Sequence, residues 1–339
     1  MHIRVPEARK QPGISYAVTS DGIELPVIDI THPAFDPSPL EARLPALAEA
    51  FVANDRRRQQ APPWLGKLFL KIFLRKSVLA RGLQRAEGSF LSGLSTYLFK
   101  LGPENLGAYA APVDRLIAAA LPAASIRLRL MDVARFLADG VQPALEARPG
   151  RPLRLVNIGG GPSIDSLNAL ILLHRRGALA GRQIQVLTLD LEPAGASFGA
   201  AALAALKAPG GALHGVDASL TRKPYDWTRP EHLRELLAGV QEGDAAVGAS
   251  SEGALLEYAE DAHVEANLTA LREATPPGTV FAGTATSDAE LATMNQRASA
   301  IRLRPRSVAA LEALVGRAGW KIARLVERPL SRNVQLIKA

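Results

Sequence analysis

Through its second half the chain alternates short apolar runs with helical segments, and this pattern most constrains what it can fold into. Five runs have the length and continuous apolar character of buried strands: LRLVNI (153–158), IQVLTLD (184–190), ALHGVD (212–217), DAAVGAS (244–250) and TVFAGTA (279–285). Strands of this kind separated by helices predict a parallel sheet with helices on both faces. Two final runs, at 320–327 and 333–339, are too close together for a parallel crossover and predict an antiparallel hairpin.

The N-terminal third has a different pattern, with proline-rich loops and a series of helical segments. Two short extended runs, ISYAVTS and IELPVIDI, precede a loop at 31–39. Helical patterns then follow at about 40–54, 63–86, 89–100, 112–121 and 125–147. The expected fold class is therefore α/β, with a Rossmann-like doubly wound sheet preceded by a mainly helical lobe.

The chain of 339 residues contains no cysteine and six histidines. Without cysteine there is no disulfide scaffold, no cysteine-based zinc or iron–sulfur site and no thiol nucleophile. No two histidines lie three to five residues apart, so a helical zinc-binding pair is absent too. We therefore expect no metal site, while a hydrophobic fraction of 47% predicts a substantial folded core.

Basic charge is concentrated in one segment of the N-terminal part. The chain has 40 Lys and Arg against 33 Asp and Glu, and nine of the basic residues lie at 56–85 with no acid among them. Apolar residues recur between them at helical spacing over 64–83, which predicts a basic amphipathic helix. Such a helix can lie on an anionic membrane, or it can pack on the protein's own core with its basic side chains reaching solvent. We favour the second arrangement.

These features set the expected location and exclude some partners. The rest of the chain is nearly charge-balanced, which argues against a nucleic-acid-binding surface. The first residues lack the apolar core of a signal peptide, and the basic residues at 64–83 argue against stable membrane insertion. We therefore expect a cytoplasmic protein, whose oligomeric state the sequence does not define.

The strongest local signal is the segment LRLVNIGGGPS, a predicted buried strand that opens into three glycines (159–161) and then a helix. Glycines there let the backbone approach a ligand closely and turn tightly into the helix. A dinucleotide fingerprint would need a third glycine where Ile164 stands, which argues against NAD and FAD. No Gly-Lys-Ser/Thr motif is present, which excludes a P-loop.

Polar residues end the next three predicted strands. Asp190 ends the second strand, Asp217 ends the third, and Ser250 ends the fourth, with Ser251 and Glu252 directly after it. Each aspartate alone could be a helix N-cap or a turn residue. Because the carboxyl ends of parallel strands meet at one edge of the sheet, the three together predict a ligand site there, with Asp190 placed to bind a ribose.

In their order along the chain, NIGGGPS, LTLDLEP, GVDASL and DAAVGASSEGALLEY resemble the motifs of class I S-adenosylmethionine-dependent methyltransferases. The resemblance covers about 127–339 and implies the strand order 3-2-1-4-5-7-6 with the last strand antiparallel. Residues 1–126 would then form a helical lobe over the cofactor. The implied cofactor is S-adenosylmethionine, and its implied binding residues are Asn157, Gly159, Gly160, Gly161, Asp190, Leu191, Asp217, Ala218 and Ser250.

The resemblance also implies which residues face the reacting end of the cofactor. Ser251, Glu252 and Tyr258 are the candidates there. If Glu252 is buried, its pKa would be raised, which suits proton transfer. The alternative is that Glu252 caps the following helix. Asn157 stands where the family usually has an acid before the loop. The change reflects either neutral drift or an advantage in holding the amine of the cofactor less firmly. Asn157 is therefore a fourth catalytic candidate.

The aromatic residues of the N-terminal lobe leave a similar choice open. Tyr97 and Tyr109, with Phe90 and Phe99, could present π faces to the sulfonium of the cofactor. Aromatic residues at helical spacing are equally typical of a plain hydrophobic core.

Three functions remain open at this point. Methyl transfer to a small molecule, in specialised metabolism, is the favoured one and needs a positioned acceptor and removal of its proton. A rarer branch of the same fold cyclises the cofactor to azetidine-2-carboxylate and methylthioadenosine through attack by its own amine, with no second substrate. The third possibility is a protein that binds the cofactor without turnover.

Overall fold

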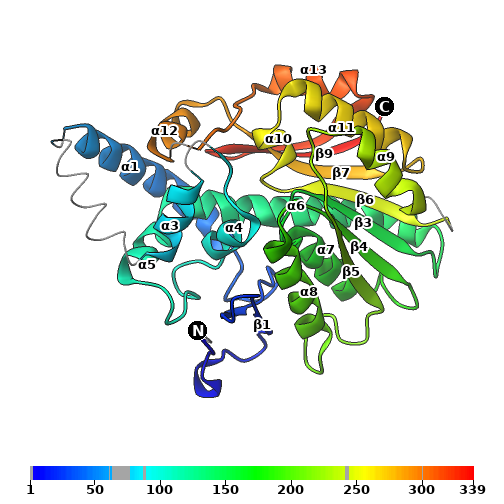
Figure 1. Cartoon of the computed structure of the whole chain (residues 1–339), viewed down its shortest axis with the longest axis horizontal. Coiled ribbons are helices and arrows are strands. Elements are labelled where there is room, and N and C mark those ends of the chain that lie inside the picture. Colours follow the sequence, from blue (N-terminus) through cyan, green and yellow to red (C-terminus); the bar gives the residue numbers. More distant parts are fainter. Residues whose placement is uncertain (1–2, 61, 63–76, 87–88, 241–243, 300) are drawn as a thin grey trace.

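The computed structural model describes residues 3–60, 62, 77–86, 89–240, 244–299 and 301–339. Their central feature is a seven-stranded sheet in the order β5-β4-β3-β6-β7-β9-β8 (Figure 1). The strands are β3 (Leu153–Ile158), β4 (Ile184–Leu189), β5 (Ala218–Lys223), β6 (Ala246–Ser251), β7 (Val280–Thr286), β8 (Trp320–Glu327) and β9 (Ser331–Lys338). β9 runs antiparallel to both its neighbours, whereas β3 to β7 pair in parallel. The predicted order 3-2-1-4-5-7-6, with its last strand antiparallel, is confirmed.

Helices cover both faces of this sheet because each central strand is apolar on both sides. Leu153 and Leu155 of β3 join one buried cluster, while Val156 and Ile158 of the same strand join the other. The first cluster lies under α6 (Leu121–Glu146), α7 (Ile164–Arg175) and α8 (Pro193–Lys207). The second lies under α9 (Glu231–Leu237), α11 (Asp261–Glu273) and α13 (Val308–Arg317). The sheet is therefore doubly wound, as its apolar strands predict.

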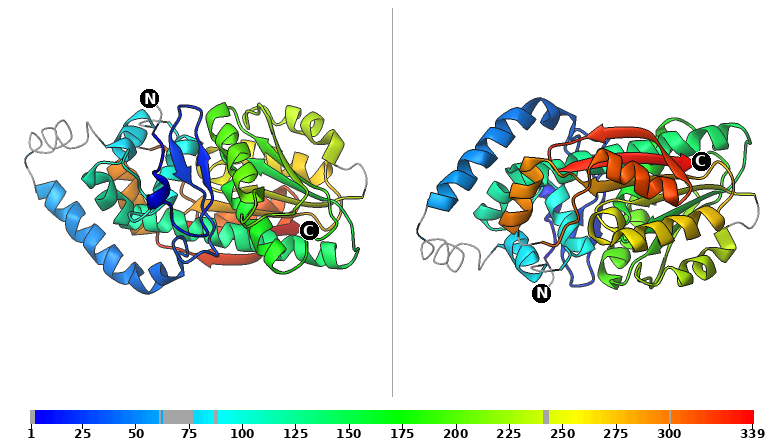
Figure 2. Two further views of the ribbon diagram at one scale, coloured as in Figure 1. Left: turned by 90° about the horizontal axis from the view of Figure 1, so that it is seen from below. Right: turned by 90° about the horizontal axis from the view of Figure 1, so that it is seen from above.

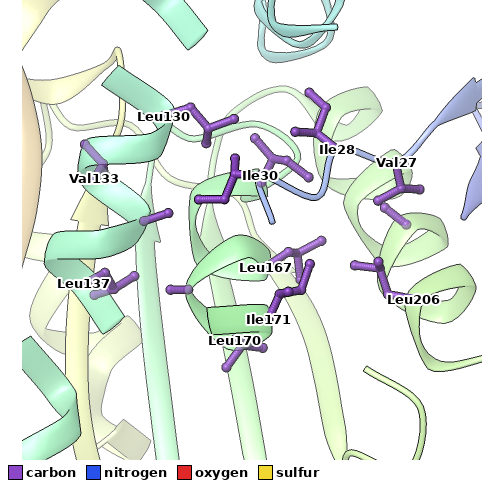
Figure 3. Packing of buried hydrophobic residues seen from close by; sticks show 14 of the residues in the cluster. Val27, Ile28, Ile30, Leu130, Val133, Leu137, Leu167, Leu170, Ile171 and Leu206 are labelled. Carbon is purple, nitrogen blue, oxygen red and sulfur yellow. The ribbon is translucent and has the colours of Figure 1, made fainter. Parts of the chain in front are cut away.

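The N-terminal segment is fixed to the sheet domain by its own apolar residues. A short 3-10 helix (Glu7–Arg9) and a hairpin of β1 (Tyr16–Val18) and β2 (Glu24–Pro26) come first. Val27, Ile28 and Ile30 then pack among residues of α6, α7 and α8 (Figure 3). Ile30 also donates its amide to Asn168 of α7 at 2.8 Å, which anchors this segment across the helix.

The remaining helices gather at one end of the sheet (Figures 1 and 2). They are α1 (Ser38–Gln60), α3 (Val78–Arg85), α4 (Gly93–Lys100) and α5 (Pro112–Ala119), joined by α12 (Glu290–Ser299) from the sheet domain and the short α10 (Leu255–Tyr258). The sequence pattern does not predict α12. The domain division at 126/127 stays a prediction, and α6 runs without a break through that point.

The third strand differs from its prediction. It spans Ala218–Lys223, not 212–217, because Gly215 takes a left-handed φ of +78° and the chain turns there. Ile184 donates its amide to the carbonyl of Asp217, so Asp217 and Ala218 stand at the amino end of β5. They therefore lie at the opposite edge of the sheet from the glycine loop, and the prediction that they contact the adenine was wrong.

The predicted basic helix falls mostly on 63–76, which lie outside the described residues. Its last part forms a separate helix, α3, which begins after Ser77, whose side chain accepts the amide of Ala80 at 2.9 Å as an N-cap. Within the part of the chain that the structure describes, no helix has the length and apolar character needed to cross a membrane.

Candidate functional site

Two cavities open at the carboxyl ends of the strands, on either side of one tyrosine. The first, which we call the strand-end cavity, has a volume of about 570 Å³ and is lined by Gly159, Asp190, Asp226, Trp227 and Gly253 among others. The second, the lobe cavity, has a volume of about 290 Å³ and lies between the N-terminal helices and the sheet. Leu91 and Tyr258 line both cavities.

The glycine loop brings the backbone to the wall of the strand-end cavity. Gly159 has a φ of +68°, and a Cβ there would lie 2.7 Å from the Cβ of Ala254 and 2.9 Å from the ring of Trp227. A side chain at Gly159 would therefore be both strained and obstructed. Gly160 and Gly161 complete the loop without lining the cavity.

Asp190 follows β4 and fixes the loop from the other side. Its carboxylate accepts hydrogen bonds from the amides of Gly161 at 2.9 Å and Glu192 at 2.8 Å. Burial raises the pKa of Asp190, although these hydrogen bonds and the nearby Arg222 lower it in part. Leu191 also lines the cavity, with 56% of its surface exposed. This is an acceptor group beside an apolar surface, as a ribose site requires.

The true carboxyl end of β5 supplies two residues that the sequence analysis missed, Asp226 and Trp227. One oxygen of Asp226 accepts hydrogen bonds from the amide and hydroxyl of Thr228, at 2.9 and 2.8 Å, which lower its pKa. A third strand predicted at 218–223 instead of 212–217 would have pointed to both residues, because they lie shortly after the carboxyl end of β5, as Asp190 lies directly after that of β4.

Three aromatic residues that line the strand-end cavity contact one another. Phe90, from the N-terminal lobe, lies edge-on to Trp227 at 6.0 Å and to Tyr258 at 6.1 Å between ring centroids. The amide of Leu91 lies 3.5 Å from the hydroxyl of Tyr258. Burial raises the pKa of Tyr258 to about 12, so this hydroxyl stays protonated near neutrality. Tyr258 can then donate a hydrogen bond but is no base.

Three predicted site residues, Asn157, Ser250 and Ser251, lie beneath the loop and line neither cavity. Asn157 donates to Asp165 at 2.7 Å and to Ser250 at 3.1 Å, and both of these partners are buried, as is Asn157. Ser251 donates to the carbonyl of Ile158 at 2.8 Å and accepts the amide of Leu255 at 2.9 Å. These contacts hold β3, β6 and the following helices together, and none of these side chains lines either cavity.

Glu252 is buried, but its surroundings differ from those predicted. Its carboxylate is paired with the ammonium of Lys100 and with Nε of Arg129, the latter at 2.5 Å. Burial alone would raise the pKa of Glu252, yet the two cations outweigh it and lower the pKa. The expectation of a raised pKa at Glu252 was wrong because two cations, from helices more than a hundred residues away in the sequence, pair with its carboxylate.

A second acid, Glu257, which the sequence analysis missed, has the properties expected of Glu252. Both of its carboxylate oxygens lie 3.0 Å from Nη1 of Arg129, and Oε1 also accepts from Thr284 at 3.4 Å. Burial raises the pKa of Glu257, Arg129 lowers it in part, and the charge of Glu252 raises it further. Glu257 lines the lobe cavity beside Tyr258.

Neither of the two tyrosines predicted to face the cofactor lines the strand-end cavity or the lobe cavity. Tyr97 is fully buried, donates to the carbonyl of Pro26 at 2.6 Å, accepts the amide of Ile28 and packs on Phe198, so it anchors the N-terminal segment. Tyr109 lines a separate pocket near β1. Of the other two aromatic candidates, Phe90 lines the strand-end cavity and Phe99 the lobe cavity.

The strand order, the glycine loop and a cavity at the strand ends define the fold of class I methyltransferases. No protein-family model and no curated protein matches the sequence. Among solved structures, a possible exported protein from Bordetella parapertussis is similar with 20% identity and a TM-score of 0.52, over 87% of this chain and 96% of that one. At that identity the similarity shows the fold alone.

Two solved methyltransferases are similar at lower scores. The mitomycin 7-O-methyltransferase MmcR has 16% identity and a TM-score of 0.40, over 84% of this chain and 71% of its own. The N,N-8-amino-8-demethyl-D-riboflavin dimethyltransferase RosA from Streptomyces davawensis has 16% identity and a TM-score of 0.38, over 68% and 60%.

Proposed function

We propose that this protein transfers a methyl group from S-adenosylmethionine to a small molecule, as the sequence resemblance implies. When bound, S-adenosylmethionine supplies an electrophilic methyl group on a sulfonium. The tasks left to the chain are to hold the cofactor, to orient an acceptor in line with the methyl group, and to accept the acceptor's proton.

The residues of the strand-end cavity fit this cofactor. Asp190 offers carboxylate oxygens to ribose hydroxyls, and Asp226 offers an acceptor for an adenine amino group. The rings of Trp227, Phe90 and Tyr258 offer faces to adenine and to a sulfonium cation. The absence of a side chain at Gly159 leaves the backbone free to approach the methionine part.

One observation favours methyl transfer over cyclisation of the cofactor: a second, mainly apolar cavity adjoins the first at Tyr258 and Leu91. An acceptor needs such a space beside the methyl group, whereas intramolecular cyclisation needs none. Asn157, whose neutral side chain would hold the cofactor amine less firmly and so suit cyclisation, instead donates from its side-chain nitrogen to Asp165 and Ser250 beneath the loop.

Product analysis tests the proposal directly. The purified protein is incubated with S-adenosylmethionine, with and without a panel of small hydroxylated and aminated aromatic compounds, and the nucleosides are identified by mass spectrometry. We expect S-adenosylhomocysteine that depends on an acceptor. Methylthioadenosine formed from the cofactor alone would establish the cyclase instead, and cofactor binding without either product would favour a non-catalytic role. The cytoplasmic location and the absence of a nucleic-acid partner stay predictions.

A further inference from the structure

The lobe cavity is built for a molecule with an apolar body and one polar end. Among its described lining residues only Arg129 and Glu257 carry charge, and they are paired with each other. Its remaining wall is mainly aliphatic and aromatic, from residues such as Phe99, Ile126 and Leu303. Its volume of about 290 Å³ lies at the lower limit for small-molecule sites, so the occupant is a small compound.

We propose that Glu257 is the general base of this site and that the acceptor is of the phenol class, a neutral apolar ring system bearing one weakly acidic hydroxyl. This inference rests on the proposed function. The acceptor's O–H gives its proton to the Glu257 carboxylate while the oxygen forms the new O–C bond to the methyl group. The S–C bond breaks, and its electron pair remains on sulfur, which becomes a neutral thioether.

The surrounding charges explain why the acceptor arrives uncharged. Glu257 faces Arg129 from α6 and Thr284 from β7, with Glu252 and Lys100 of α4 behind Arg129 and Tyr258 beside it. With both glutamates ionised, Arg129 and Lys100 are each paired with a carboxylate, so a carboxylate or an ammonium on the acceptor would find no free partner among these four groups. A phenol brings no charge into this buried site.

The same arrangement favours loss of the phenol proton at the moment of reaction. Once Glu257 is protonated, Nη1 of Arg129 no longer faces a charged carboxylate, although Nε stays paired with Glu252, and Nη1 can stabilise the negative charge that develops on the phenol oxygen. A base works best when its pKa lies close to that of the group it deprotonates, and burial raises the pKa of Glu257 toward that of a phenol.

The neighbouring candidates for a base are excluded by their contacts. Glu252 does not line the lobe cavity and is held by two cations. Tyr258 lines the cavity but keeps its proton, with the amide of Leu91 directed at its oxygen. An acid is also better matched to a phenol than to an aliphatic alcohol, whose hydroxyl is a far weaker acid.

Matched probes test the acceptor class. Wild-type protein with S-adenosylmethionine is offered 2-naphthol, 2-naphthoic acid, 2-naphthylamine or 2-naphthalenemethanol, which share one ring system and differ in the polar group. We expect S-adenosylhomocysteine from 2-naphthol at a rate at least tenfold above the other three. Faster turnover of the acid, the amine or the alcohol than of 2-naphthol would overturn the assignment. So would the absence of turnover with all four compounds while S-adenosylhomocysteine still binds. Failure of cofactor binding itself would instead overturn the proposed function.

Substitution at Glu257 tests the base. We expect E257Q to lower kcat for 2-naphthol at least a hundredfold with little change in KM, and to abolish the fall of kcat toward low pH. With 4-nitrophenol at a pH where it is already ionised, the loss should be at least tenfold smaller, because no proton remains to be removed and the substitution leaves Nη1 of Arg129 free to pair with the phenolate. Equal losses with both phenols would overturn the role.

Two further variants keep this test interpretable. E260Q makes the same change three residues away at an exposed acid paired with Arg304, and it should leave both rates as in the wild type. If E257Q does not fold, as judged by thermal unfolding and S-adenosylhomocysteine affinity, E257D replaces it and should retain the pH dependence at a reduced rate. A pH-independent wild-type or E257D rate would contradict the proposal.

Discussion

The backbone amide of Gly161 donates a hydrogen bond of 2.9 Å to Oδ2 of Asp190, and this contact joins the glycine loop after β3 to the end of β4. The second oxygen of the same carboxylate accepts the amide of Glu192 at 2.8 Å. Asp190 is thereby held in one orientation at the wall of the strand-end cavity, with its remaining lone pairs available to a ligand.

Replacing Asp190 with alanine should therefore weaken cofactor binding. The loss of a charge-assisted hydrogen bond to a ribose costs about 1.5–3 kcal/mol, which corresponds to roughly a 10- to 150-fold rise in Kd. Calorimetric titration with S-adenosylhomocysteine measures it. D217A is the matched control, because Asp217 lies at the amino end of β5, and its Kd should equal that of the wild type. An unchanged Kd for D190A would show that the cofactor does not occupy this cavity.

Cofactor affinity should also depend on pH through the same carboxylate. Hydroxyls of a ribose donate hydrogen bonds to the ionised acid, and burial raises the pKa of Asp190. Protonation removes acceptor capacity, so affinity should fall on acidification and should begin to fall at a higher pH than for an ordinary aspartate. Titrations with S-adenosylhomocysteine at several pH values check this, and D190N should bind weakly with no such dependence. A flat wild-type profile would contradict the assignment.

The strands of the sheet could be predicted wherever their side chains are buried on both faces. β3 begins and ends at the predicted residues, and β7, which is buried throughout, lies within one residue of its prediction at each end. β5 was misplaced because its own residues alternate between buried and partly or fully exposed, while the more apolar run at 212–217 precedes it. The error at β5 then displaced the predicted adenine contacts to Asp217 and Ala218.

The charged residues of the site could not be predicted in the same way. Glu252 and Glu257 stand close to the end of β6 in the sequence, but their cation Arg129 comes from α6, and Lys100 comes from α4. A local pattern records no pairing over 123 to 152 residues. The direction in which the pKa of a buried acid is shifted depends on such partners, which is why the raised pKa predicted for Glu252 is found at Glu257 instead.

The contact between α4 and the glycine loop should be sensitive to a single methyl group. A Cβ on Gly93 would lie 2.6 Å from Cα of Gly161, so the first turn of α4 rests directly on the loop. We expect G93A to force the helix away, lowering the melting temperature and weakening S-adenosylhomocysteine binding at least tenfold. G316A, in helix α13 with nothing near its Cβ, should instead stabilise the protein by about 0.5–1 kcal/mol. Thermal unfolding and calorimetry measure both, and equal behaviour of the two variants would refute the close packing.

The paired acid Glu252 should act mainly on stability. E252Q takes from Lys100 the carboxylate with which it pairs and from Arg129 one of two, and removing one partner of a buried ion pair typically costs about 3–5 kcal/mol. E265Q, at a half-buried surface acid paired with Arg317, is the matched control and should cost less than about 1 kcal/mol. Denaturant unfolding measures both.

The pH dependence of unfolding gives an independent check on Glu252. Because its pKa is lower in the folded than in the unfolded protein, its contribution to the free energy of unfolding is fully present above the ordinary glutamate pKa. That contribution is lost as the pH falls from there through the lowered folded pKa. E252Q should therefore lose stability on acidification less steeply than the wild type over this range. Parallel pH profiles for the two proteins would mean that the cations do not hold Glu252 ionised.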